Sequence, residues 1–239
     1  MGAEEDDDAT SWKSQCVVRL LVYEAAVTEP RWQMSGFRMS PTVVVSAMPR
    51  TLRDWCSRPG DSFTFIASAA AGGVDVPLLP RSFHLVPEDD HGVATEHQWY
   101  VLVLDAHGGR RLPGPCVRGA TPADTSPQHW DHLWLVGYRS ASSRGGVAHT
   151  AGQLARNSAP NRHTCSAPAG FEGAPLCVAS SLWPMKSRVE LPVVLVGLHV
   201  GCCPNGVYNR FAPGAWVETC AFGPHGAPGP SQLRACVIL

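Results

Sequence analysis

The sequence contains little charge and no excess of basic residues. Only 16% of its 239 residues are charged, and 19 Lys and Arg against 20 Asp and Glu give a formal net charge of −1. Proteins that bind DNA or RNA usually carry clustered Lys and Arg that neutralise phosphates. The composition therefore argues against a nucleic-acid partner. The apolar fraction of 44% is typical of a globular chain and too high for a disordered one.

Long apolar runs are also missing. No run approaches the roughly 18 apolar residues that a transmembrane helix needs. The first eight residues are mostly acidic, whereas a secretory signal peptide begins with positive charge and continues into an apolar region. We therefore expect a cytoplasmic protein whose residues 1–13 form an acidic, disordered segment.

The nine cysteines form no standard metal or disulfide pattern. The chain contains no Cys-x-x-Cys pair. The one group in the same half of the chain has spacings that fit no zinc module: His163, Cys165, Cys177, Cys202 and Cys203. Without a secretion signal, reduced thiols are expected. The sequence therefore predicts neither a metal nor a cofactor.

The 23 Gly and 21 Pro disfavour long helices, and the best helical candidate is the short stretch 150–156. Short β-branched and aromatic segments instead alternate with clusters of Gly, Pro, Ser and Asp, a pattern typical of strands and turns. Six such segments stand out: Val17–Tyr23, Thr42–Ser46, Phe63–Ile66, Trp99–Leu104, Leu133–Val136 and Val193–Val200. Many short strands at such spacing predict an all-β sandwich or a pair of barrels.

A segment rich in Gly, Pro, Asp and Thr, residues 106–128, divides the chain into halves of similar size. Each half has enough strand segments to close a small barrel. We therefore expect a first barrel over residues 14–112, a second over 113–222, and a flexible Gly/Pro tail over 223–239.

Two motifs in the second half resemble the trypsin-like serine proteases. Residues 170–176, Gly-Phe-Glu-Gly-Ala-Pro-Leu, resemble the Gly-x-Ser-Gly-x-Pro loop that carries the nucleophile. Residues 196–201, Val-Gly-Leu-His-Val-Gly, resemble the Gly-x-His strand of the specificity pocket in the glutamate- or glutamine-cleaving branch, which includes viral main proteases. Residues 208–211 follow where the last barrel strands would pass.

Two motifs in the first half agree with this resemblance. Residues 35–41 and 44–49 resemble the glycine hairpin that leads into Val-Leu-Thr-Ala-Ala-His, and residues 99–105 resemble the strand that begins with the catalytic Asp. The pieces occur in the family's order and spacing over residues 14–222. The resemblance implies a chymotrypsin-like double six-stranded β-barrel.

The same resemblance places the three catalytic positions on unsuitable residues. The histidine position falls on Pro49, the aspartate position near Gln98 and the serine position on Glu172. A general base must accept a proton from the nucleophile, which proline cannot do. The resemblance therefore implies a pseudoprotease that binds another protein.

Two further positions follow from the resemblance. The backbone N–H groups of Gly170 and Glu172 correspond to the oxyanion hole, a nest of donors that favours negative charge. Either the Glu172 carboxylate or an acidic group of a partner is expected there, unless Glu172 is simply an exposed loop residue. His199 is a vestigial pocket residue that could donate to a peptide's Glu or Gln, or a structural histidine hydrogen-bonded to its neighbours.

The last four residues, Cys236 to Leu239, match the C-a-a-X prenylation signal, and the terminal Leu favours a geranylgeranyl group. The sequence thus predicts a lipid at Cys236 that tethers the protein to a cytoplasmic membrane face. No polybasic segment accompanies the motif, so the membrane association is expected to be reversible or to need a protein partner.

Two alternatives remain open. The chain is an active peptidase with a displaced catalytic set if Cys165, or a serine near it, is activated by His163. Other histidines that could supply a base from an unexpected position are His84, His91, His97, His129 and His132. A purely structural subunit of a larger assembly is the second alternative.

Overall fold

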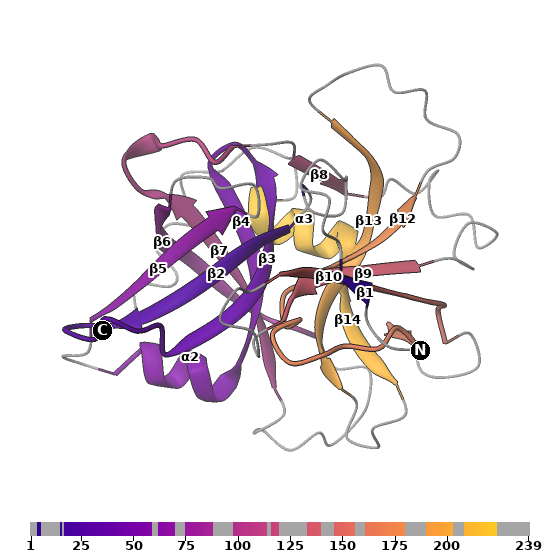
Figure 1. The fold of residues 1–239 in the computed structure, drawn as a ribbon, viewed down its shortest axis with the longest axis horizontal. Coiled ribbons are helices and arrows are strands. Elements are labelled where there is room, and N and C mark those ends of the chain that lie inside the picture. The colour runs from indigo at the N-terminus through magenta and orange to yellow at the C-terminus, as the bar shows by residue number, and fades with distance from the viewer. Residues whose placement is uncertain are drawn as a thin grey trace.

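The computed structural model describes residues 4–5, 15, 17–58, 62–69, 75–87, 98–113, 116–119, 133–139, 146–155, 161–179, 190–202 and 208–223. Two groups of strands lie side by side, with the N-terminal group in indigo to magenta and the C-terminal group largely in orange and yellow (Figure 1). No helix among these residues is long and apolar enough to cross a membrane.

The N-terminal group is a closed six-stranded barrel in the order β2-β3-β4-β7-β6-β5. Because side chains alternate along a strand, β7 uses Leu102 and Leu104 to fill the barrel and Val101 and Val103 to face the second group. The strands are β2 (Val17–Glu24), β3 (Trp32–Ser40), β4 (Val43–Pro49), β5 (Phe63–Ala69), β6 (Val76–Leu85) and β7 (Trp99–Ala106).

The C-terminal group is an eight-stranded sheet in the order β1-β10-β9-β12-β13-β14-β11, with β8 paired to β13. An isolated bridge between Leu154 and His163 joins the segment after β10 to β11, so the sheet curves into a half-barrel. We call it the C-terminal sheet. Its strands are β1 (Glu4–Glu5), β8 (Cys116–Gly119), β9 (Leu133–Tyr138), β10 (Val147–Gly152), β11 (Arg162–His163), β12 (Pro175–Ala179), β13 (Glu190–Cys202) and β14 (Asn209–Pro213). The prediction of an all-β fold is confirmed.

Two expectations about local structure need correction. The helix expected over residues 150–156 is wrong for residues 150–155, and residue 156 lies outside the described residues: Thr150 pairs with Leu135 as part of β10, because backbone pairing to β9 overrides a weak local preference. Among the described residues, the helices are α2 (Arg50–Cys56) and α3 (Gly214–Phe222), which begin directly after Pro49 and Pro213, and η2 (His107–Gly109) is a single turn. Proline is tolerated there because its fixed φ suits a helix start.

The second correction concerns the acidic N-terminus. Glu4 and Glu5 form β1 and pair with His149 and Ala148, within the stretch expected to be disordered. An edge strand such as β10 offers unpaired backbone groups that any extended segment can use, whatever its side chains.

Three apolar clusters make up the core. One fills the first barrel around Leu20, and one lies inside the C-terminal sheet around Leu135. The third lies between the two groups and combines Val45 of β4 with Leu198 of β13 and Val217 of α3. This shared cluster joins the barrel and the sheet into one packed unit.

Candidate functional site

Pro49 and Gln98 lie next to each other. Pro49 ends β4 and precedes α2, and the strand register pairs it with Trp99, the neighbour of Gln98. The backbone N–H of Arg50 donates to the carbonyl of Gln98 at 2.9 Å, and its Nη1 donates to Gln98 Oε1 at 3.0 Å. The Gln98 side chain is therefore held by a guanidinium.

The loop that carries Glu172 is fixed to the first barrel through Ser35 of β3. The N–H of Ser35 donates to the Glu172 carbonyl at 2.9 Å, and Ser35 Oγ donates to the Gly170 carbonyl at 2.7 Å. Ser46 Oγ, on the strand that ends at Pro49, donates to the Ser35 carbonyl at 2.6 Å. These bonds hold the Glu172 loop against β3 and β4 of the barrel, where the barrel meets the C-terminal sheet.

Gly173 makes this close approach possible. Its φ is +80°, a region that favours glycine, and a Cβ there would overlap the Ser35 carbonyl and Ser46 Oγ. Its N–H donates to the His199 carbonyl at 2.9 Å, which connects the loop to β13 as well. The loop is thus held from both sides by backbone contacts.

The Glu172 carboxylate lies over its own loop. The N–H of Gly170, a buried residue with φ +95°, donates to Glu172 Oε2 at 2.9 Å. This contact corresponds to the first alternative that the sequence leaves open, in which the carboxylate is bound by the nest instead of being free in solvent.

His199 is buried and paired with a second histidine. Its side chain is 2% exposed, and its Nδ1 lies 3.2 Å from Nε2 of His163, which is fully buried. Burial lowers the pKa of His163 to about 4. Burial also holds the pKa of His199 well below its usual range, helped by His163 and opposed by the backbone of Arg210. Both imidazoles are therefore neutral at pH 7, and the contact favours the structural alternative for His199.

Comparison with known proteins identifies the architecture. Neither a protein-family model nor a curated protein matches the sequence. A solved Glu endopeptidase superposes with a TM-score of 0.57 over 92% of this chain and 94% of its own, at 14% identity. The chain has the chymotrypsin-like double-barrel fold. The active form of the Rv3671c protease from M. tuberculosis gives a TM-score of 0.53 at 16% identity, covering 99% of this chain and 94% of its own. A serine endoprotease from Yersinia pestis gives 0.50 at 17%, covering 90% and 66%.

In this chymotrypsin-like fold, Cys165 is not placed as a nucleophile. Its side chain is fully buried, and its Sγ lies 4.0 Å from the Leu133 carbonyl, while His163 contacts His199. Burial raises the pKa of the Cys165 thiol to about 12, whereas a reactive thiolate needs a lowered pKa. The structure contradicts the hypothesis that His163 activates Cys165. Among the described residues, no group of three or more His, Cys, Asp or Glu could hold a metal ion.

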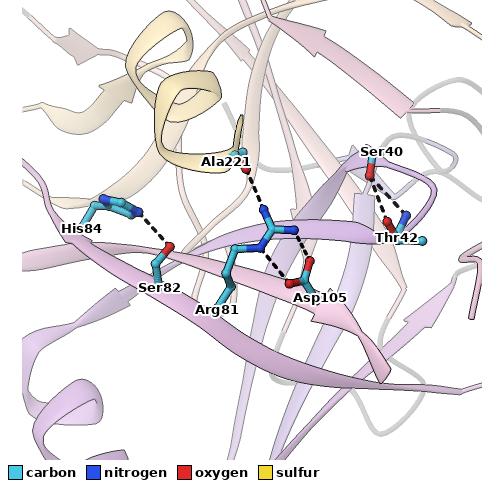
Figure 2. A network of polar contacts seen from close by, with 7 residues as sticks. All are labelled: Ser40, Thr42, Arg81, Ser82, His84, Asp105 and Ala221. Atoms are coloured by element: carbon cyan, nitrogen blue, oxygen red, sulfur yellow. Dashed lines mark hydrogen bonds and ion pairs between the residues drawn. The ribbon is translucent and has the colours of Figure 1, made fainter. Parts of the chain in front are cut away.

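The structure does bring one serine and one histidine together. On β6, Ser82 Oγ and His84 Nε2 are 2.8 Å apart (Figure 2). Their Ser-x-His spacing places both side chains on one face of the strand, a signal that the sequence contained. Burial lowers the pKa of His84, and its tautomer decides whether Nε2 donates to the hydroxyl or accepts from it.

A charged contact adjoins this pair. The Arg81 guanidinium binds both carboxylate oxygens of Asp105, and its Nη1 donates to the Ala221 carbonyl in the last turn of α3 at 2.7 Å (Figure 2). Asp105 is therefore engaged with Arg81. His91, His97, His129, His132 and Cys236 lie outside the described residues.

Proposed function

We propose that the protein is a catalytically inactive homologue of the trypsin-like serine proteases that acts as a protein-binding module. The proposal rests on the residue types at three positions, Pro49, Gln98 and Glu172, and on the bonds that hold the Glu172 loop against the barrel strands β3 and β4. Proline has no group that takes a proton from a nucleophile, and the Gln98 amide carries no charge. Glu172 could act only as an acceptor, and Gly170 already binds its carboxylate.

One structural feature supports a binding role. The loop 170–173 is held by Ser35 and His199 although its catalytic position carries a carboxylate. A fold alone does not define a function, so the nature of the partner rests on experiment.

The C-terminal motif supports the second part of the proposal, a lipid at Cys236 that holds the module at a cytoplasmic membrane face. A single lipid chain without a polybasic segment gives reversible binding. The tethered module would thus exchange between the membrane and the cytoplasm, carrying its partner with it.

A serine-reactive probe tests inactivity. Wild type, Glu172→Ala and Glu172→Ser are incubated with a fluorophosphonate, and labelled peptides are identified by mass spectrometry. We expect no labelling in any of them, because a serine at 172 still has Pro49 where the base would stand. Labelling of Glu172→Ser but not of Glu172→Ala would show that a base serves this position and would refute the proposal.

An active peptidase with a displaced catalytic set is the second candidate, and the contact between Ser82 and His84 favours it. In such dyads a third group usually orients the base, but the nearby Asp105 is paired with Arg81. If wild type is labelled, mapping of the label to Ser82 and its loss in His84→Gln would establish this alternative.

A further inference from the structure

We propose that the outer face of β2, β5 and β6 is an interface on which two copies of this chain form a symmetric dimer. This surface, the outer barrel patch, consists of neighbouring side chains that point away from the barrel interior. They are Tyr23 on β2, Thr64 and Ile66 on β5, and Pro77 and Leu79 on β6.

The outward direction of these side chains follows from the strands themselves. The core inside the barrel takes the alternate residues of the same strands, among them Val22, Phe65 and Leu78. Because successive side chains point to opposite faces of a strand, the residues between them face outward. The register pairs Tyr23 with Thr64, and Ile66 with Pro77, so the patch is continuous across the three strands.

The C-terminal sheet does not cover this patch. Among the described residues, the buried cluster shared by barrel and sheet includes no member of β5 or β6, which lie on the side of the barrel away from the sheet (Figure 1). Leu79 is 53% exposed, more than any other large hydrophobic side chain that the structure describes, and Ile66 and Pro77 are partly exposed. Outward positions of a solvated wall are usually polar, and an apolar group there marks an interaction surface.

Two opposite charges border the patch on opposite sides. Arg19 of β2 pairs with Ser68 of β5, and Asp75, which directly precedes β6 and is exposed, continues the same row beyond β5. Neither charge forms an ion pair within the described part of the chain, where Arg19 Nη2 donates to the neutral Gln33 amide at 2.6 Å. The patch is therefore apolar at its centre, positive along β2 and negative along β6.

Such a surface is complementary to itself. A two-fold axis parallel to β5 turns one patch onto the other, so that β2 of each copy faces β6 of the other copy. Tyr23 then meets the other copy's Leu79, and Ile66 meets its own counterpart on the axis. At both edges, Arg19 lies across from the other copy's Asp75. A partner of a single charge sign would satisfy only one edge, so the charge pattern favours a second copy.

The dimer should be weak. A barrel wall is convex, so contact is limited to about three strands of each copy, and interfaces at the small end of the range belong to transient complexes. We expect a dissociation constant on the order of tens of micromolar. Two copies would carry two lipids at Cys236, and stable membrane anchoring takes two signals; this consequence, unlike the dimer itself, rests on the proposed tether.

Sedimentation velocity of the full, unlipidated chain tests the dimer under reducing conditions. Concentrations run from about tenfold below to about tenfold above the expected dissociation constant. Wild type should pass from monomer to dimer over this range. A wild type that stays monomeric throughout would overturn the proposal and leave the patch to a different protein.

A point charge then identifies the face. Ile66→Lys sets two ammonium groups against each other on the axis and should weaken dimerisation at least about tenfold. The control Leu85→Lys adds the same charge at a 46% exposed position at the end of β6, outside the patch, and should change dimerisation by less than about twofold. A dimer that persists in Ile66→Lys uses another face and refutes the assignment.

An exchange of charges tests the pairing without depending on a single variant. Asp75→Arg places two guanidinium groups opposite each other at both edges and should weaken dimerisation about fivefold or more. Adding Arg19→Asp re-forms both pairs with their signs exchanged and should restore the dissociation constant to within about threefold of wild type. A double variant as weak as Asp75→Arg would contradict the two-fold arrangement. None of these changes touches the loop 170–173, so their outcome is independent of probe labelling at position 172.

Discussion

Acid should destabilise this protein through the buried pair of His163 and His199. Burial lowers the pKa of His163 from 6.5 to about 4 and lowers that of His199 in the same direction. Between these values the unfolded chain binds a proton that the folded chain does not. The free energy of unfolding is therefore highest above about pH 6.5 and declines as the pH falls toward 4.

The size of the effect follows from the shift at His163, which is fully buried. One pKa unit corresponds to about 1.4 kcal/mol, so a pKa lowered from 6.5 to about 4 removes about 3 kcal/mol from the free energy of unfolding on acidification to pH 4. For a chain of this length, one kcal/mol moves the melting temperature by about 2–4 °C. Acidification from pH 7 to pH 4 should thus lower it by about 6–12 °C through His163 alone.

The assay compares the free energy of unfolding between pH 7 and pH 4 for wild type, His163→Leu and His107→Gln, whose position on η2 is exposed. Carboxylates titrate in all three proteins, so the difference between curves isolates the buried imidazole. His163→Leu should cost about 1–3 kcal/mol at pH 7, because His199 loses its partner, but its curve should be flatter. Parallel curves, or an NMR titration that places His163 near 6.5 in the folded protein, would refute the reasoning.

Three further predictions concern the loop, the helix and the tail. Gly173→Ala should lower the free energy of unfolding by about 3 kcal/mol or more, since a Cβ at this positive φ meets Ser35 and Ser46. The control Gly146→Ala, whose Cβ faces open space, should change the free energy of unfolding by less than about 0.5 kcal/mol. Urea unfolding measures both variants, and equal midpoints would contradict the contact. Arg81→Gln should lower the free energy of unfolding by about 1 kcal/mol, because the ion pair with Asp105 is partly exposed, and should speed amide exchange in the last turn of α3. Asp105→Asn leaves the bond from Arg81 to Ala221 in place and should speed that exchange less. Cys236→Ser should move the protein from the membrane fraction of cells to the soluble one, and a wild-type C-terminus without a prenyl mass would count against tethering.

Strands were predictable where periodicity was local and uninterrupted. Val17–Tyr23 and Trp99–Leu104 fall within β2 and β7, because apolar β-formers mark both strands without a break. β6 escaped prediction because Pro77 and Pro80 interrupt it, and a bulge between Pro80 and Ser82 absorbs the irregularity. Prolines also hid the helices, since the residue type that breaks a helix stands directly before both α2 and α3.

At the candidate site, motif order predicted which residues to examine but not their contacts. The bond from Arg50 to Gln98 joins residues 48 positions apart, and that from Ser35 to Gly170 joins residues 135 apart. No local pattern encodes such pairs. Likewise, the spacing of His163 and Cys165 allowed a thiol with its base, whereas the fold turns His163 toward His199, on a distant strand.

Ser35 restricts motion between the barrel and the C-terminal sheet. This one buried residue donates to Gly170 and Glu172, accepts from the N–H of Tyr138, and receives the Ser46 hydroxyl at its carbonyl. Any hinge motion that widened the junction between barrel and sheet would have to break several of these bonds at once. The junction between barrel and sheet is therefore rigid. A partner must fit the junction at its existing width, because binding cannot easily widen it.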